Sequence, residues 1–263
     1  MRLALDIGGT HLRVLAAGDA APERHYRARL DGMAPEDLVA RLRGLVADWA
    51  IMPSAIGVSI AAVVSPDGRL LTSENTGWAG VPLAALLAEA FGCRVAVETD
   101  IFCGALHEAR NGAARGLASA LCVAVGTGIG HALVLDGRVW RGAAGGANAL
   151  GHLVLDPNGA PCYCGHRGCL CQTASGRAQD GKPVTDAPIL ALARGIGAAV
   201  TLVEPEAVIL SGGALVQAWF DLDRLAAAIP AQSYPGARPP RVVLSDEPCA
   251  NLRGALLLAS EAP

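Results

Sequence analysis

Short apolar runs and the spacing of apolar residues divide the chain into strands and helices separated by glycine-rich turns. The helical pattern is clearest from Pro35, where Glu36 and Asp37 occupy the first turn and apolar residues recur three and four positions apart. The first half is expected to contain strands over residues 2–7, 11–17, 24–28, 55–60 and 94–98, and helices over 35–49, 82–91 and from 100 onward.

The second half opens like the first. A strand over 117–125 ends in Gly126-Thr127-Gly128 and a second strand follows, just as the strand over 2–7 ends in Gly8-Gly9. The other elements expected are strands over 131–135, 207–210 and 241–244, a strand after the turn at 136–137, a helix over 189–203, a helix beyond 213, and a final helix from 251. This repetition predicts a duplicated α/β unit, with domains over 1–112 and 113–250 and a cleft between them.

Composition favours a globular protein and excludes several partners. Hydrophobic residues make up 52% of the chain and charged residues 17%, which suits a large buried core. With 21 basic side chains, 24 acidic side chains and 4% aromatic residues, the chain lacks the basic stripe and stacking surface of a nucleic-acid binder. Residues 116–135 carry no formal charge, but their glycines favour a strand and turn over a membrane span. Without an export signal, we expect a cytoplasmic protein that binds neither nucleic acid nor membrane.

Two glycine loops carry the first chemical signal. In Asp6-Ile7-Gly8-Gly9-Thr10 an acidic residue lies at the end of a strand, two glycines allow close approach to a ligand, and a hydroxyl follows. Backbone N–H groups and Thr10 suit phosphate oxygens, and Asp6 suits hydrated Mg²⁺. Gly126-Thr127-Gly128-Ile129-Gly130 repeats the loop in the second half. Each loop alone also fits a tight hairpin, but the pair predicts a clamp for nucleotide phosphates.

Cysteine and lysine are unevenly distributed. Four of the eight cysteines crowd one loop, where thiolates can converge on a zinc ion: Cys162, Cys164, Cys169 and Cys171. The only lysine, Lys182, precedes Pro183, which lacks the hydroxyl that a phosphate-binding loop places after its lysine. We therefore expect residues 176–183 to form an ordinary loop.

Six segments together resemble the ordered signatures of the ROK sugar kinases, over nearly the whole chain. They are Asp6 to Arg13, Glu74-Asn75-Thr76-Gly77-Trp78, Val97-Glu98-Thr99-Asp100, Gly126 to Gly130, Gly151-His152, and Cys162 to Leu170. The resemblance implies the actin-like ATPase fold, with two RNase H-like domains, and transfer of phosphate from Mg-ATP to a sugar hydroxyl, such as the 6-hydroxyl of a hexose or amino hexose. It also implies a helix over 251–263 that packs back on the first domain, and a homodimer as the assembly common among relatives.

The resemblance also implies roles for individual residues. Asp100 becomes the general base that takes the proton of the attacking hydroxyl, although an Asp at a helix start can also serve as a cap. The implied contacts are Asp6, Gly8, Gly9, Thr10, Gly126, Thr127 and Gly128 for phosphate and Mg²⁺, Gly212 and Gly213 for adenine, and Asn75, Thr99, Asp100, Asn148 and His152 for the sugar. The implied structural zinc site, in an inserted loop over 152–171, consists of His152, Cys162, Cys164 and Cys169. His166 remains an alternative to His152, and Cys171 remains a competing ligand.

Several sugar-binding positions depart from the family pattern. Thr99 stands where the family has Asn, and Ala149 and Cys171 stand where it has glutamates that bind the sugar. Ala61-Ala62 replaces a pair that usually contains glycine, which adds methyl groups where the sugar would approach. A buried hydroxyl without a partner costs about 1–3 kcal/mol, so the pattern predicts a kinase for a deoxy, amino or otherwise altered sugar.

A catalytically weak regulator that binds sugar or nucleotide is the alternative hypothesis. The residues expected to handle phosphate and the proton, Asp6, Thr10 and Asp100, are all present and argue against it. Family repressors carry a helix-turn-helix extension before the kinase-like body, and a first loop at residue 6 leaves no room for that extension.

Overall fold

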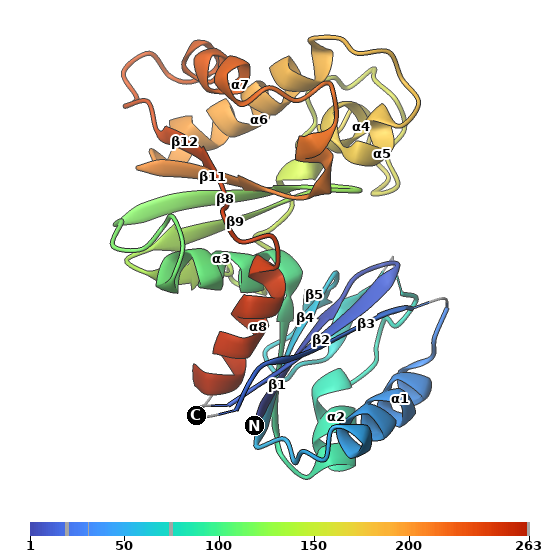
Figure 1. Cartoon of the computed structure of the whole chain (residues 1–263). Coiled ribbons are helices and arrows are strands. Elements are labelled where there is room, and N and C mark those ends of the chain that lie inside the picture. The colour runs from blue at the N-terminus through green and yellow to red at the C-terminus, as the bar shows by residue number, and fades with distance from the viewer. Residues whose placement is uncertain (19–20, 31, 74–75, 262–263) are drawn as a thin grey trace. The chain divides into compact units, whose positions relative to one another are not determined.

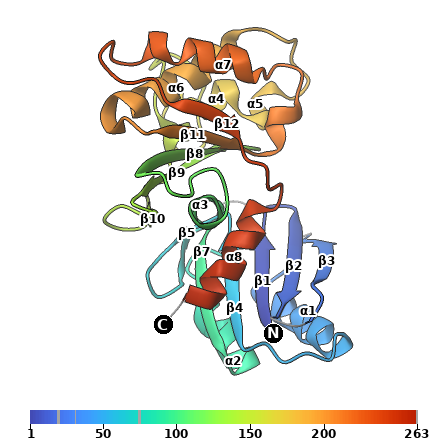
Figure 2. The ribbon, with the colours of Figure 1, turned by 60° about the vertical axis from the view of Figure 1, so that its left-hand side comes forward.

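The computed structural model describes residues 1–18, 21–30, 32–73 and 76–261 (Figures 1 and 2). The chain divides into two compact units. Unit 1 comprises Met1–His107, Gly142–Gly146 and the segment from Cys249 onward, and unit 2 comprises Glu108–Arg141 and Ala147–Pro248. No helix in the described part of the chain is long and apolar enough to cross a membrane.

Unit 1 is built on a five-stranded sheet in the order β3-β2-β1-β4-β7. The strands are β1 (Arg2–Ile7), β2 (His11–Ala17), β3 (Arg24–Arg29), β4 (Ala55–Ile60) and β7 (Arg94–Thr99). β1 is antiparallel to β2 and parallel to β4, which is parallel to β7. A small hairpin of β5 (Val63–Val64) and β6 (Leu70–Thr72) surrounds a turn at Asp67-Gly68.

Helices cover both faces of this sheet, because successive side chains of a strand point to opposite sides. Leu3 and Leu5 of β1 share a core with α1 (Pro35–Asp48) and α2 (Leu83–Phe91). Ala4, between them, packs instead with residues of α3 (Asp100–Arg110) and α8 (Ala250–Glu261). Figure 2 shows α8 lying across β1 and β4.

Glycine lets α8 approach the sheet closely. A Cβ at Gly57 of β4 would lie 1.8 Å from the carbonyl oxygen of Ala255, and a Cβ at Gly254 would lie 1.8 Å from that of Cys103. Helix backbone therefore contacts strand and helix backbone directly, which a larger residue at either position would prevent.

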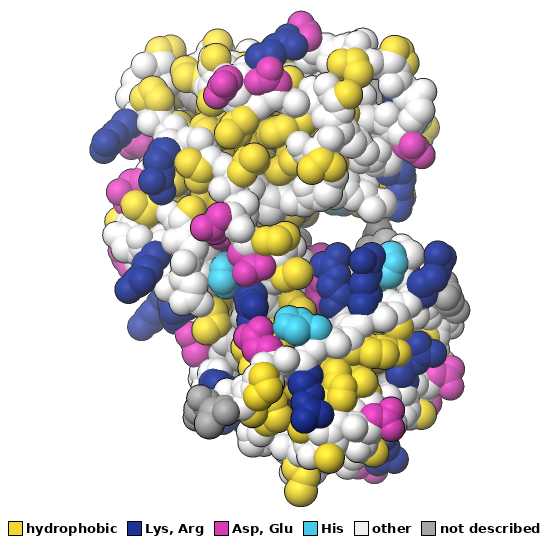
Figure 3. Space-filling model, viewed as in Figure 1, with side chains coloured by type: hydrophobic (Ala, Val, Ile, Leu, Met, Phe, Trp, Pro, Cys, Tyr) yellow, Lys and Arg dark blue, Asp and Glu magenta, His cyan; other side chains and the backbone are white. Residues whose placement is uncertain are grey.

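The outer strand β3 is protected by charge. Arg24, Arg27 and Arg29 are exposed along it, and Figure 3 shows Lys and Arg side chains gathered over this end of the sheet. Charged side chains on an edge strand discourage pairing with another chain, which explains why this strand is polar and gives a weak sequence signal.

Unit 2 repeats the same strand order, as β10-β9-β8-β11-β12. The strands are β8 (Ser119–Val125), β9 (Ile129–Leu135), β10 (Arg138–Trp140), β11 (Ala207–Ser211) and β12 (Arg241–Leu244). The helices are α4 (Cys171–Ala174), α5 (Gly176–Gln179), α6 (Ala187–Val203) and α7 (Leu222–Ala228), with 3₁₀ turns η1 (Leu150–His152), η2 (Gly213–Val216) and η3 (Pro230–Gln232). The predicted duplication is confirmed strand by strand.

One expectation was wrong in this unit. Residues 176–183 were expected to be a loop, but α5 forms there because the side chain of Ser175 accepts a hydrogen bond from the N–H of Ala178. The helix expected beyond residue 213 is α7, which follows the 3₁₀ turn η2 and begins where Asp221 accepts a hydrogen bond from the N–H of Arg224.

Candidate functional site

A row of polar side chains crosses the carboxyl ends of three parallel strands in unit 1. Register places Asp6 of β1 beside Ser59 of β4, and Ser59 beside Glu98 of β7. All three are buried, in a sheet whose other central positions are apolar. Because ligands of open α/β sheets bind beyond the carboxyl ends of the strands, this edge is the candidate site of unit 1.

Asp6 is held from two sides. Ser59 Oγ donates to Asp6 Oδ1 at 3.0 Å, and Arg13 Nη1 lies 3.4 Å from Oδ2. Burial raises the pKa of Asp6, while the hydrogen bond from Ser59 and the charge of Arg13 act in the opposite direction. A bound cation would favour the ionised form, so this carboxylate is suited to hold one.

Asp100 is the first residue of α3 and follows β7 directly. Its Oδ1 accepts a hydrogen bond from the N–H of Ile101 at 2.7 Å. Burial raises the pKa of Asp100 to about 6, that hydrogen bond lowers it, and the charge of Asp6 raises it further. The carboxyl therefore titrates close to neutral pH, as a general base must, while it also bonds to the start of its helix.

Thr99, expected to contact the sugar, is only 2% exposed. Its hydroxyl donates to the carbonyl oxygen of Ala62 at 2.9 Å, and its N–H donates to Glu98 Oε1 at 2.9 Å. The side chain thus ties β7 to the segment after β4, and the sugar contact stays a prediction.

The first glycine loop is a tight turn between β1 and β2. The N–H of Gly8 donates to the carbonyl oxygen of His11 at 3.0 Å, and Gly9 and Thr10 are exposed. The loop therefore presents Gly9 and Thr10 to a ligand beside Asp6. Asn75, another expected sugar contact, lies outside the described residues.

Three glycine segments meet at the carboxyl end of β8 in unit 2. The N–H of Gly126 donates to the carbonyl oxygen of Gly128 at 2.9 Å, and the N–H of Gly176 donates to that of Gly126 at 2.8 Å. Gly212 has φ +109°, and a Cβ there would lie 2.4 Å from the carbonyl oxygen of Val125. The structure thus brings together the loops at 126–128 and 212–213, which are far apart in the sequence.

His131 positions the segment that leads to His152, a role that the sequence did not reveal. The N–H of Leu150 donates to His131 Nδ1 at 3.1 Å, and the N–H of His131 donates to the carbonyl oxygen of Asn148 at 3.0 Å. Burial lowers the pKa of His131, which keeps the ring neutral and its Nδ1 an acceptor. Asn148 itself is half-buried and Ala149 is exposed.

Four ligand atoms converge in the cysteine loop of the same unit. His152, Cys162, Cys164 and Cys169 bring one ligand atom each to within 4.8 Å of all the others. Cys162 Sγ lies 3.6 Å from His152 Nδ1, and Cys164 Sγ lies 3.6 Å from Cys169 Sγ. Tetrahedral zinc with bonds of about 2.3 Å to sulfur spaces its ligands by about 3.7 Å, so this donor set fits a zinc ion.

His166 and Cys171 adjoin this group without belonging to it. His166 Nδ1 lies 3.6 Å from Cys164 Sγ, and Cys171 Sγ lies 3.7 Å from Cys162 Sγ. Gln172 Nε2 lies 3.3 Å from Cys162 Sγ. Although burial opposes ionisation of Cys162, hydrogen bonds from Cys164 and Gln172 lower its pKa to about 6, which favours the thiolate that a metal requires.

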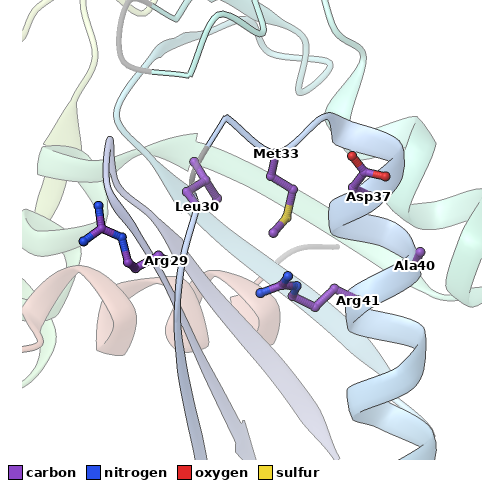
Figure 4. A pocket seen from close by; sticks show the side chains of 6 residues that line it. All are labelled: Arg29, Leu30, Met33, Asp37, Ala40 and Arg41. Atoms are coloured by element: carbon purple, nitrogen blue, oxygen red, sulfur yellow. The ribbon is translucent and has the colours of Figure 1, made fainter.

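A separate cavity of about 550 Å³ lies between β3 and α1 in unit 1 (Figure 4). Met33 and Arg41 point into it, and none of the residues predicted from the sequence as site residues lines it. The cavity is therefore not part of the candidate site.

The chain is similar to known proteins of one family. The sequence model of the ROK family matches residues 2–183. The kanosamine kinase of Amycolatopsis mediterranei (strain S699) is 32% identical over 247 residues, which cover 80% of this chain and 80% of that protein.

Solved structures match along the whole chain. A ROK hexokinase from Thermus thermophilus superimposes with a TM-score of 0.81 at 28% identity, covering 98% of this chain and 97% of that one. A ROK family glucokinase from Streptomyces griseus, in complex with glucose and AMPPNP, gives a TM-score of 0.82 at 25% identity and covers 99% of each chain. With the repeated sheet order, these matches confirm the expected actin-like ATPase fold.

Proposed function

The chain belongs to the ROK family and is a carbohydrate kinase, and we propose that Asp100 is the general base through which it phosphorylates a sugar hydroxyl with ATP. The observation that carries the proposal is the position of Asp100. Asp100 directly follows β7, at the sheet edge where Asp6, Ser59 and Glu98 form the polar row, and its pKa is raised to about 6. A carboxyl group of this kind can take a proton near neutral pH.

In this mechanism the protein positions the reactants and offsets charge. Asp100 accepts the proton of the sugar hydroxyl while the hydroxyl oxygen attacks the γ-phosphorus of ATP, and ADP leaves. Mg²⁺ neutralises phosphate charge when bound, and Asp6 would hold it, directly or through water. The loops at Gly8-Gly9-Thr10 and Gly126-Thr127-Gly128 would donate backbone N–H groups to phosphate oxygens, and Gly212-Gly213 would border adenine.

For the substrate we propose a sugar that lacks or replaces one of the usual hydroxyl groups. Ala149 and Cys171 supply no carboxylate at positions where the family has glutamate, and the hydroxyl of Thr99 is bonded to backbone. The 32% identity with a kinase named for kanosamine, an amino sugar, supports this class. Asn75, Asn148 and His152 remain the proposed polar contacts.

The test is sugar-dependent ADP release with Mg-ATP across hexoses, N-acetylhexosamines, amino sugars including kanosamine, deoxy sugars and pentoses. We expect one altered class to be phosphorylated and the rate to vanish in Asp100→Asn. Efficient turnover of plain glucose at millimolar concentration would contradict the substrate proposal. Silence across the panel, with ATP still raising the melting temperature, would favour a binding protein instead.

We also propose that zinc occupies the group formed by His152, Cys162, Cys164 and Cys169. The support is the spacing of these atoms. With Nδ1 on the metal, the other nitrogen of His152 stays available to the sugar, so a structural ion would orient a substrate contact. Metal analysis should find one zinc per chain, lost in His152→Ala and kept in Cys171→Ser and in Cys93→Ser. Loss of zinc in Cys171→Ser alone would show that Cys171 is the true fourth ligand.

A further inference from the structure

A cavity of about 250 Å³ opens beside the second glycine loop in unit 2. Its lining includes Thr127 and Gly128 of the loop together with Arg177 and Lys182. Every residue that lines it belongs to unit 2, so its geometry is defined within one compact body. The volume suits a group of phosphate size with its surrounding water.

The charge of this cavity has one sign. Arg177 and Lys182 are its only charged lining residues, although the chain as a whole carries a net charge of −3. Within the described ranges, neither side chain forms an ion pair with an acidic residue. The single lysine of a chain that otherwise uses arginine thus lies where a phosphate-binding loop borders a hollow.

The start of α5, which carries Arg177, is bonded to the glycine loop. The residue before it, Gly176, donates its N–H to the carbonyl oxygen of Gly126 at 2.8 Å, and Ser175 caps the short helix α5. The Arg177 guanidinium carbon also lies 5.9 Å from the ring centroid of Tyr163. The hydroxyl of Tyr163 in turn lies 3.8 Å from the place that a Cβ of Gly128 would take. Loop, ring and guanidinium therefore border one hollow.

We propose that Arg177 and Lys182 form a cation pair that binds the phosphate chain of the nucleotide in this cavity, an inference that rests on the proposed kinase function. A planar guanidinium bonds two phosphate oxygens at once, and an ammonium group acts as a point charge beside them. The arrangement differs from a P-loop, because Lys182 precedes a proline and comes from a different segment than the glycine loop.

Lys182 also borders a second cavity, of about 250 Å³, together with Gln217 and Trp219. Those two residues follow the Gly212-Gly213 turn, which is expected near adenine. A nucleotide with its phosphates beside Thr127 could therefore place either its phosphates or its base against Lys182. The proposal requires the phosphates, and a test must separate the two.

The single lysine makes that test direct. Pyridoxal 5′-phosphate condenses with an amine, losing water to form a C=N bond, and borohydride then delivers hydride to give a stable secondary amine. The only amines in the chain are Lys182 and the N-terminus, which serves as an internal reference. Peptide mass spectrometry should show at least threefold slower labelling of Lys182 with ATP or inorganic tripolyphosphate, and unchanged labelling with adenosine. Equal protection by adenosine, or no protection by tripolyphosphate, would overturn the proposal.

Variants supply the second test. Lys182→Gln and Arg177→Gln should each raise the Kd for ATP, measured by calorimetry, about tenfold, and weaken its dependence on salt concentration. Arg194→Gln, at an exposed position of α6, is the matched control and should bind ATP like the parent chain. Unchanged ATP affinity in both variants would refute the cation pair even if sugar is phosphorylated. Protection of Lys182 by ATP without turnover of any sugar would instead refute the proposed function and leave the pair standing.

Discussion

The two units have separate sheets of the same strand order, but the sheets differ in the chemistry at their carboxyl edges. In unit 1, Asp6 of β1 is paired in register with Ser59 of β4. The equivalent pair in unit 2 is Ala124 of β8 with Ser211 of β11. Ala124 lies two residues before Gly126, just as Asp6 lies two residues before Gly8. The serine is present in both units, and the carboxylate is present only in the first.

This difference indicates how the two units divide the proposed reaction. In the proposed reaction, unit 1 supplies two carboxylates, Asp6 to hold a divalent cation and Asp100 to accept a proton. Unit 2 has no acidic side chain in the hollow beside its glycine loop and places Arg177 and Lys182 there instead. A carboxylate close to the phosphate chain repels it unless a cation lies between them, so the proposed division assigns Mg²⁺ and the proton to unit 1 and direct neutralisation of phosphate charge to unit 2.

Removing the base from unit 1 should have the largest effect. Asp100→Asn keeps the shape of the side chain but cannot take a proton, so kcat for sugar phosphorylation should fall by about 10²–10⁴. The fold should survive, because the variant removes a carboxyl that is costly to ionise. Asp136→Asn, in an exposed hairpin turn, is the matched control and should keep full activity. An Asp100→Asn enzyme with more than a tenth of the parent rate would exclude Asp100 as the base.

The packing of α8 on the sheet of unit 1 is a structural difference between the two units. Gly57 of unit 1 corresponds in register to Ile209 of unit 2. At Gly57 the carbonyl oxygen of Ala255 in α8 occupies the space that a Cβ would take, whereas position 209 holds an isoleucine side chain. Gly57→Ala should lower the free energy of unfolding by about 1–3 kcal/mol through overpacking. Gly44→Ala, in the exposed middle of α1 with nothing near its Cβ, should raise it by about 0.5–1 kcal/mol. Denaturant titration of both variants measures this, and equal effects would show that α8 does not rest on β4.

Giving unit 2 the carboxylate of unit 1 should impair nucleotide binding. Ala124→Asp places a negative charge beneath the second glycine loop, and we expect the KM for ATP to rise about tenfold. Ala124→Asn has nearly the same shape without the charge and should change KM for ATP less than threefold. Steady-state kinetics with varied ATP compares the two, and equal effects would mean that shape rather than charge matters there.

The raised pKa of Asp100 predicts a pH dependence. The base acts when ionised, so kcat/KM for the sugar should rise with pH through about 6 and be roughly tenfold below its plateau at pH 5. The free energy of unfolding should change in the opposite direction and fall as pH rises. A carboxyl whose pKa is raised from 3.8 stabilises the fold at low pH, and that contribution is lost as pH rises through about 6. A flat rate profile between pH 5 and 8 would contradict the assignment.

Much of this fold could be predicted from the sequence, because its signals are local. The strands at 2–7, 11–17, 55–60 and 241–244 have the predicted bounds, and the repeated glycine turns revealed the duplication. The crowded cysteines likewise pointed to a metal site, and three of them, Cys162, Cys164 and Cys169, converge in the structure. The fourth member of the group, His152, was implied by the family resemblance and not by the cysteine spacing.

What the sequence missed depends on contacts between distant segments. Ser59 is an unremarked residue of an apolar strand until register places it against Asp6. His131 shows its role only when the N–H of Leu150 reaches its ring. The hollow beside Lys182 is lined by residues from segments that are far apart in the chain, such as Thr127 and Arg177, and Gly176 donates its N–H to the carbonyl oxygen of Gly126. No local pattern encodes these three contacts.

The most direct test of the proposed division of labour is the ATP affinity of Asp100→Asn, measured by calorimetry with Mg²⁺ beside its rate of sugar phosphorylation. If unit 2 binds the phosphate chain and Asp100 only accepts the proton, the Kd for ATP should stay within about threefold of the parent value while turnover is lost. Loss of ATP affinity together with turnover, or turnover that persists, would contradict the account.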